Sequence, residues 1–582
     1  MLHLLAPALL ALPVATLAAS HAVTALDGAA VAHAAAVAHA AVASTPGAEE
    51  RSSGGELLPE EAAYDVRHYD LALTVRPETK TIEGLLGMRA HLVAATPAIV
   101  MDLDELLAIS AVKLDGEPVE FRRDANRIYV QAAELEVGQS FTVEVAYSGA
   151  PLVAANPPWS GGFTWATSAD GSPWIATSCQ GEGADLWWPC KDHPSDEPDG
   201  LDLHITVPDP LVVAANGRLV EVVPTDEEGW STHHWRVTTP INNYGVALAI
   251  GPYETITTDY ENPYGDTFPF TFWVLPEAKE QAEKVFAEFQ EHMRILEELC
   301  GPYPFRGDKY GIAHVPFLGM EHQSIIAYGN RFGNDPWYRL PYDALHQHEL
   351  AHEWWGNLVT ARDWNDFWIH EGIGTYMQAL HLERTSGVEN MRAKMRFDRR
   401  TLANRGAVAP RGARTTKWMY FGDRSSTSPG GDIYNKGSWV CHTLRWLLTD
   451  DVFFTVLRRW AYPDPELEKT TDGSACRSAT TDELLGIAEK VSERELDWFF
   501  QVYLRQPALP RLDHEVVDGM LRLNWRLEGD VPFPMPVEVL VGDELVRVET
   551  DDDGAGELEV GDSKFEIDPN GWLLKATERR KR

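Results

Sequence analysis

Cysteine and basic residues are scarce in this 582-residue chain. It has 5 cysteines (Cys179, Cys190, Cys300, Cys441 and Cys476), and their odd number and wide spacing exclude a disulfide framework and a cysteine-based metal site. Only the first two are close enough in sequence to pair, and whether they form a disulfide stays open. Lys and Arg number 50 against 88 Asp and Glu, a formal net charge of -38. A field of that sign repels phosphate backbones, so we expect no nucleic-acid partner.

Long apolar runs are also missing, apart from one near the N-terminus. The run over 4–18 is too short and too rich in alanine to span a bilayer, and small residues around 20–22 follow it. These features predict a signal peptide over 1–22, export to the periplasm or the extracellular space, and no stable membrane insertion. Residues 23–60 are rich in Ala, Ser and Gly without an apolar stripe, which predicts a disordered linker.

Apolar material is otherwise ample, at 44% hydrophobic residues with 20 Trp, and the chain is too long for a single core. Short alternating runs over 61–255 predict an all-β, sandwich-like domain. Helical spacing over 256–508 predicts a mainly helical domain. Alternation returns over 509–578, which predicts a small C-terminal β-sandwich before a basic tail at 579–582. The predicted fold class is therefore multidomain α+β.

Two histidines stand four residues apart in His348-Glu349-Leu350-Ala351-His352, in a segment whose pattern predicts a helix over 343–356. This spacing puts both imidazoles on one helix face, where they can reach one ion. Glu349 lies beside that face. A carboxylate there can take a proton from water activated by a metal and pass it to a leaving amine.

Glu371 supplies a third ligand from a second predicted helix, 366–387, with eighteen residues between it and His352. Three protein ligands with one position left open form the arrangement of catalytic zinc sites, so we expect one Zn2+ at His348, His352 and Glu371. Gly372 and Gly374 cost about 1 kcal/mol each inside a helix, which close helix packing beside the metal would explain. A loop at this point is the alternative.

The segments around these ligands resemble the zinc aminopeptidase family that contains aminopeptidase N and leukotriene hydrolase. The resemblance is carried by HELAHEWWGNLVT at 348–360 and WNDFWIHEG at 364–372. It extends to GMEHQ at 319–323, YNKG at 434–437 and YDVRHYDLALTV at 64–75. It implies a thermolysin-like catalytic domain of the gluzincin type. We expect the large helical domain that ends many relatives to be absent.

In this family a Gly-x-Met-Glu-Asn motif precedes the zinc helix, and its Glu grips the free α-amino group of the substrate. The resemblance places that role at Glu321, with Gly319 and Met320 beside it as substrate-binding residues. An anion fixed one residue's length from the metal admits only a charged N-terminus. Leu318 and His322 stand where Gly and Asn are common, and the variant is similar to bacterial members of the family.

Two further roles follow from the resemblance. Relatives have a second amine contact shortly before a Pro-Cys-x-Asp segment, which here is 189–192. Counting back points to Gln180, with Glu182 as the alternative. Tyr434 resembles the family tyrosine whose phenol donates a hydrogen bond to the oxyanion, an effect of roughly 3 kcal/mol in comparable sites.

These features predict a zinc metallo-aminopeptidase that hydrolyses the N-terminal bond of peptides with a free N-terminus. Glu321 and Gln180 would hold the amine, Glu349 would move the proton and Tyr434 would stabilise the oxyanion. A thermolysin-like endopeptidase and a noncatalytic binding scaffold on the same fold are the alternatives. The preferred N-terminal residue, the limit on peptide length and the oligomeric state stay open.

Overall fold

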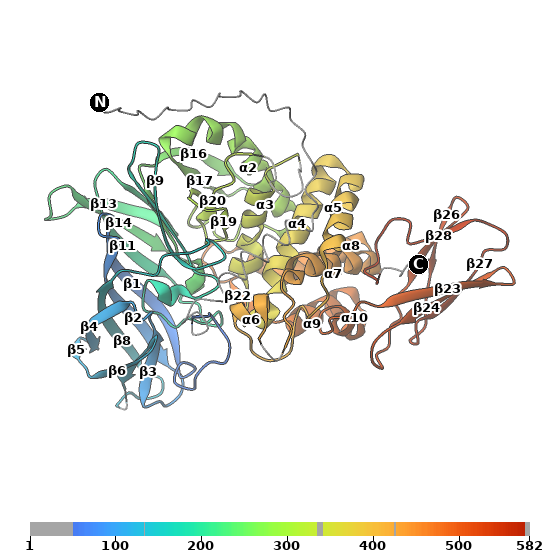
Figure 1. Ribbon diagram of the computed structural model, residues 1–582, viewed down its shortest axis with the longest axis horizontal. Helices are drawn as coiled ribbons and strands as arrows, with labels where there is room; N and C mark the ends of the chain where they lie inside the picture. The colour runs from blue at the N-terminus through green and yellow to red at the C-terminus, as the bar shows by residue number, and fades with distance from the viewer. Residues whose placement is uncertain (1–50, 133, 334–340, 424–425, 577–582) are drawn as a thin grey trace, which may run out of the picture.

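The computed structural model describes residues 51–132, 134–333, 341–423 and 426–576. The expected signal peptide at 1–22, residues 23–50 of the expected linker and the tail at 579–582 lie outside the described residues. Figure 1 shows sheets at the N-terminal end, helices in the middle and a small pair of sheets at the opposite end. The predicted α+β class is confirmed. Within the described ranges, no helix combines the length and the apolar character needed to cross a bilayer.

The N-terminal part is built from strands that alternate between buried and exposed side chains. Strand β1 (Tyr64–Arg76) turns Tyr69, Leu71 and Leu73 into the core, as expected for a half-buried strand. An eight-stranded sheet has the order β13 (Arg218–Pro224), β14 (Trp230–Val237), β11 (Leu201–Pro208), β1, β2 (Thr81–Leu92), β8 (Ser140–Gly149), β4 (Leu107–Leu114), β5 (Glu117–Pro118). Two smaller sheets have the orders β12 (Val212–Ala215), β15 (Leu248–Gly251), β10 (Pro173–Ser178), β9 (Gly162–Thr167) and β3 (Ala98–Asp102), β7 (Arg127–Gln131), β6 (Phe121–Asp124). Cys179 and Cys190 are buried in this part as free thiols.

A five-stranded sheet opens the catalytic part. Its order is β16 (Glu254–Glu261), β17 (Thr267–Val274), β18 (Tyr310–His314), β20 (Ile326–Tyr328), β19 (Gly319–Met320). The short strand β19 lies at the sheet edge, pairing antiparallel with β20 alone. Glu321 follows it directly, so the edge of the sheet sets the position of the predicted amine-binding carboxylate.

Helices follow this sheet. They are α2 (Lys279–Cys300), α3 (Ala344–Ala351), α4 (Trp368–Ser386), α5 (Val388–Thr401), α6 (Thr416–Phe421), α7 (Asp432–Leu448), α8 (Asp450–Ala461), α9 (Thr481–Ser492) and α10 (Asp497–Tyr503). Between them β21 (Val359–Ala361) pairs in parallel with β22 (Arg477–Ala479).

The predicted zinc-binding helix is shorter than expected. The helix expected over 343–356 ends at Ala351, and a π-helical turn (Glu353–Leu358) with non-helical backbone at Trp355 and Gly356 follows. Further along the chain, α9 ends where Glu493 takes a left-handed conformation with φ 54°, and α10 begins after it.

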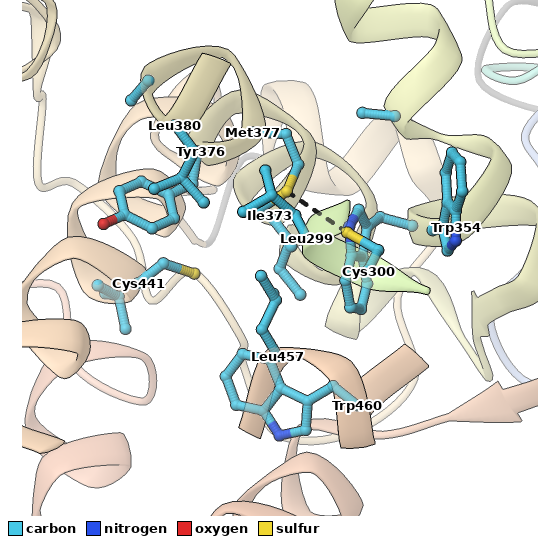
Figure 2. Close-up of a cluster of buried hydrophobic side chains, with 14 of the residues drawn as sticks. Leu299, Cys300, Trp354, Ile373, Tyr376, Met377, Leu380, Cys441, Leu457 and Trp460 are labelled. Atoms are coloured by element: carbon cyan, nitrogen blue, oxygen red, sulfur yellow. Dashed lines mark hydrogen bonds between the residues drawn. The ribbon is translucent and has the colours of Figure 1, made fainter. Parts of the chain in front are cut away.

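Helix α4 crosses the core of the catalytic part. Figure 2 shows Ile373, Tyr376 and Met377 of α4 among side chains of α2, α7 and α8. Cys300 of α2 donates its thiol hydrogen to the Met377 sulfur over 3.7 Å. Most of α4 is buried, so burial fixes the rotation of the helix that carries Glu371. All four tryptophans near the zinc motif, Trp354, Trp355, Trp364 and Trp368, are fully buried core residues.

The C-terminal part is a pair of three-stranded antiparallel sheets. Their orders are β23 (Arg511–Val517), β24 (Met520–Arg526), β27 (Ala555–Glu559) and β26 (Glu544–Val548), β25 (Val537–Val541), β28 (Phe565–Ile567). Leu521, Leu523, Val537 and Val539 are buried between them. This is the small β-sandwich that the alternating pattern predicts.

Residues 51–60 correct the prediction of a disordered linker over 23–60. Arg51 pairs with Asp104, and the backbone N–H of Ser53 donates to the carbonyl of Gly181 over 3.4 Å. The Ser53 carbonyl accepts the backbone N–H of Thr416 over 3.1 Å. Composition and local pattern do not reveal these contacts, because they join residues far apart in the sequence. We call residues 51–55 the strap, since it joins the N-terminal and catalytic parts.

The strap predicts a steric requirement at Gly54. A Cβ atom there would lie 2.2 Å from Cδ1 of Trp364, and the backbone has φ +77°. We expect Gly54→Ala to lower the free energy of unfolding by about 1–3 kcal/mol more than Gly138→Ala. Gly138 is a matched control, with φ +90° and no atom within 4 Å of its Cβ position. Urea unfolding of both variants measures the difference, and equal effects would contradict the packing of the strap.

Candidate metal centre and peptide site

Helix α3 presents the two histidines toward one point. The Asp343 side chain caps the helix by accepting the N–H of His346 over 3.1 Å. His352 follows the last helical residue, and the Nε2 atoms of His348 and His352 lie 3.2 Å apart. Nδ1 of His352 donates to the carbonyl of Trp355 over 2.8 Å, which the early end of the helix makes possible. In the neutral ring the proton is therefore on Nδ1, and Nε2 of His352 has the lone pair that can bind a metal.

Glu371 comes to the same point from α4. Its Oε2 lies 3.5 Å from Nε2 of His348 and 3.5 Å from Nε2 of His352. Tetrahedral zinc with bonds of about 2.0–2.1 Å requires ligand atoms roughly 3.3–3.4 Å apart. Within the described residues, Oε2 of Glu371 is buried without a hydrogen-bond partner. The spacing and the unpartnered oxygen both fit a zinc ion held by these three side chains.

Glycines allow the elements around the metal site to approach closely. A Cβ on Gly372 would lie 2.7 Å from Cα of Gly437, so α4 and α7 cross in direct backbone contact. A Cβ on Gly374 would lie 3.3 Å from the ring of His352. Both glycines are inside α4, so the predicted close packing is confirmed and the loop alternative is wrong.

Glu321 and Glu349 extend the site with two more carboxylates. Ligand atoms of Glu321, Glu349 and His352 all lie within 4.8 Å of one another. A Cβ on Gly319 would lie 2.6 Å from Oε1 of Glu349, so a larger residue there would displace this carboxylate from its present position. Met320 is buried beside them. The structure thus brings Gly319, Met320 and Glu321 next to the zinc helix. In the sequence, Glu321 and Glu349 are 28 positions apart.

The electrostatics of this cluster favour added positive charge. Burial raises the pKa of Glu321 to about 7, and burial together with the charge of Glu321 raises the pKa of Glu349 well above its usual value. Burial alone would lower the pKa of His352, but the Glu321 and Glu371 carboxylates raise it to about 10. Burial would likewise raise the pKa of Glu371, yet the two imidazoles hold it well below its usual range. Metal binding displaces protons from sites of this kind.

Gln180, and not Glu182, contacts the carboxylate of Glu321. The Gln180 side-chain amide donates a hydrogen bond to Oε1 of Glu321. Glu182 instead accepts the backbone N–H of Gly161 over 2.6 Å and lies 3.6 Å from Nζ of Lys417. The structure therefore separates the two alternatives that the sequence left open.

His322 and His370 are buried next to the site residues without joining the metal cluster. His322 lines a small apolar cavity, and burial lowers its pKa to about 3, so the ring is neutral at neutral pH. Nε2 of His370 accepts the backbone N–H of Ala361 over 2.8 Å, and its Nδ1 lies 3.4 Å from the hydroxyl of Tyr244. Both rings are structural neighbours of the site.

Tyr434 lies in the first turn of α7 and faces His348, with ring centroids 6.3 Å apart. Its hydroxyl is 2.9 Å from the hydroxyl of Tyr420, a residue that sequence analysis did not identify. Burial raises the pKa of both phenols well above the usual value, so both keep their protons at neutral pH. Tyr244, also missed, has its hydroxyl beside the Glu321 carboxylate. No local signal marks either tyrosine, because each reaches the site from a distant segment.

The fold and the site together define a protein whose helical part holds a candidate metal site of two histidines and one glutamate. The Peptidase M1 N-terminal domain matches residues 66–244, and the Peptidase family M1 domain matches residues 299–503. These matches cover about two thirds of the chain. The chain belongs to peptidase family M1.

Several named proteins are similar to this chain in sequence or in structure. Leucine aminopeptidase 2 of Candida albicans is 26% identical over 54% of this chain and 47% of its own length. Aminopeptidase N of Streptomyces lividans is 25% identical over 60% of this chain and 41% of its own length. The chain spans about half the length of these relatives. A crystal structure of an M1 zinc metallopeptidase from Deinococcus radiodurans superposes with a TM-score of 0.61 at 24% identity, covering 77% of this chain and 94% of that one.

The ligand geometry predicts how zinc content responds to substitution. Glu371→Gln replaces an anionic ligand by a neutral one, so we expect it to lose most of its zinc on dialysis. Glu349→Gln leaves all three ligands in place, and we expect it to keep one zinc per chain, as the unchanged protein does. Elemental analysis by mass spectrometry measures both. Full zinc content in Glu371→Gln would contradict the assignment of this residue as a ligand.

Proposed function

We propose that this protein is a zinc aminopeptidase that removes the N-terminal residue from peptides with a free α-amino group. The observation that carries the proposal is the Glu321 carboxylate, buried within 4.8 Å of ligand atoms of Glu349 and His352 and hydrogen-bonded to Gln180. A buried carboxylate needs a cationic partner, and an N-terminal ammonium is such a partner.

The residues of this chain divide the work of peptide hydrolysis. A zinc ion held by the two histidines and Glu371 would polarise the peptide carbonyl and make water acidic near neutral pH. Glu349 accepts a proton from the attacking water and returns it to the departing nitrogen, for which the raised pKa of this carboxylate is suited. Tyr434 donates a hydrogen bond to the oxygen on which negative charge develops.

Glu321 and Gln180 determine which peptide bond of the substrate is cleaved. With the ammonium group fixed at Glu321, the first peptide bond is the one that meets the metal and Glu349. The Gln180 amide donates one hydrogen bond to Glu321, and its carbonyl oxygen remains available to accept one from the ammonium group. A variant of the Deinococcus radiodurans enzyme is described as bound to a Tyr-Ser-Ala substrate, a short peptide of the expected class.

Each of the two alternative functions, a thermolysin-like endopeptidase and a noncatalytic scaffold, leaves one of the buried carboxylates without a role. A thermolysin-like endopeptidase needs no free amine and gains nothing from a buried carboxylate one residue from the metal. A noncatalytic scaffold has no need for Glu349, whose carboxylate occupies space that a side chain at residue 319 would otherwise contest. The space kept for Glu349 favours a catalytic role.

We expect hydrolysis of free peptides to exceed that of the same peptides N-acetylated by about 100-fold or more, because acetylation removes a charge-assisted contact to Glu321. Glu321→Gln should abolish most of this discrimination by slowing cleavage of the free peptides alone. Glu297→Gln is the matched control, since Glu297 is also a buried carboxylate but bonds the side chains of Tyr260 and Asn262, away from this cluster. The ratio of kcat/KM for the two peptides measures the effect. Equal rates on both peptides with the unchanged protein would establish the endopeptidase alternative instead.

We also propose that the protein is exported, on the basis of the apolar run at 4–18 and the small residues that follow it. Expression in a host with an intact export pathway, followed by N-terminal sequencing of the protein recovered outside the cytoplasm, tests this. We expect the mature chain to begin close to residue 23. Recovery of the uncleaved chain, starting at Met1 in the cytoplasm, would contradict the proposal.

A further inference from the structure

Helix α6 brings a second phenol to the catalytic part of the site. Tyr420 stands at its end, and its hydroxyl oxygen lies 2.9 Å from that of Tyr434 in the first turn of α7. That distance is normal for an O–H···O hydrogen bond. Both tyrosines are partly buried.

The number of hydrogens limits what this pair can do. A phenol carries one hydrogen and two lone pairs. If Tyr434 gives its hydrogen to Tyr420, none is left for the substrate. If Tyr420 is the donor, the hydrogen of Tyr434 is free to point at the oxyanion. A hydroxyl that accepts one hydrogen bond also becomes a stronger donor in another, because the two bonds polarise each other.

Contacts independent of Tyr434 hold Tyr420 in place. The ring of Phe367 meets the Tyr420 ring edge to face, with centroids 5.7 Å apart and an interplanar angle of 81°. At the other end of α6, the carbonyl of Ser53 in the strap accepts the N–H of Thr416 over 3.1 Å. The ring contact and the anchored helix together hold the Tyr420 side chain in place. The Tyr434 hydroxyl, by contrast, has its hydrogen direction set by whichever group it bonds.

The same short helix also reaches the amine end of the site. Lys417 lies three residues before Tyr420 and therefore close to it on the helix surface. Its Nζ is 3.6 Å from Oε1 of Glu182, two residues from Gln180. Helix α6 thus contacts the loop that carries Gln180 and the tyrosine that faces His348. A helix placed in this way can align the two ends of the substrate site.

We propose that Tyr420 is a positioning residue that donates its hydroxyl hydrogen to Tyr434 and so directs the Tyr434 hydroxyl to the oxyanion. The inference rests on the proposed function, because it assigns Tyr434 the role of oxyanion donor. It adds a residue from outside the zinc helix, the Glu321 motif and the Tyr434 motif.

A double-mutant cycle on the zinc-loaded protein tests the inference. We expect Tyr420→Phe to lower kcat about tenfold with KM unchanged, and Tyr434→Phe to lower kcat about 100-fold or more. In the double variant, loss of the Tyr420 hydroxyl should cost nothing further, because there is no Tyr434 hydroxyl left to direct. Effects that multiply in the double variant, or a rise in KM without a fall in kcat, would overturn the proposal.

A spectroscopic measurement separates this inference from the proposed function. With 3-fluorotyrosine placed at position 434 in the zinc-loaded protein, we expect Tyr420→Phe to shift the ¹⁹F resonance. Tyr462→Phe is the matched control, since the Tyr462 hydroxyl bonds the carbonyl of Pro302 instead. An unchanged resonance in Tyr420→Phe would refute the contact. If the protein cleaves no peptide, the proposed function fails, while the resonance still decides whether Tyr420 positions Tyr434.

Discussion

Buried negative charge is the constraint on which the rest of the site depends. Glu321, Glu349 and Glu371 are each almost inaccessible to solvent. Among the residues that the structure describes in this cluster, the cationic partner is the His352 imidazole, whose pKa the carboxylates raise to about 10 against the effect of burial. Burial and mutual repulsion push the pKa values of Glu321 and Glu349 upward. A dication at the two histidines and Glu371, and an ammonium group at Glu321, would balance this charge. The same electrostatic demand therefore accounts for both the metal site and the proposed preference for a free amine.

Close backbone approach makes that concentration of charge possible. Gly372 meets Gly437 where α4 crosses α7, and Gly319 leaves space for the carboxylate of Glu349. The burial of α4 in the helical core then holds Glu371 opposite the two histidines. A site whose members come from the rigid core of a domain keeps its geometry when substrate binds. The glycines near the metal are thus requirements of packing.

The amine end of the site belongs to both major parts of the molecule. Gln180 comes from the N-terminal part, whereas its partner Glu321 follows an edge strand of the catalytic part. The strap joins the two parts through Ser53, which bonds both Gly181 and Thr416. In the proposed function, substrate recognition would therefore be a property of the interface, and contacts there, including those of α6, would act on catalysis without touching the metal.

The sequence by itself determined the features that depend on neighbours along the chain. The i, i+4 spacing of His348 and His352 and the alternation of the strands are local patterns, so their structures could be predicted, and the resemblance added Glu321 and Tyr434. Only the tertiary structure chose Gln180 over Glu182, placed Tyr420 against Tyr434 and ordered residues 51–60. It also ended the zinc helix at Ala351. These outcomes depend on contacts between segments far apart in sequence, and no local periodicity or composition encodes such contacts.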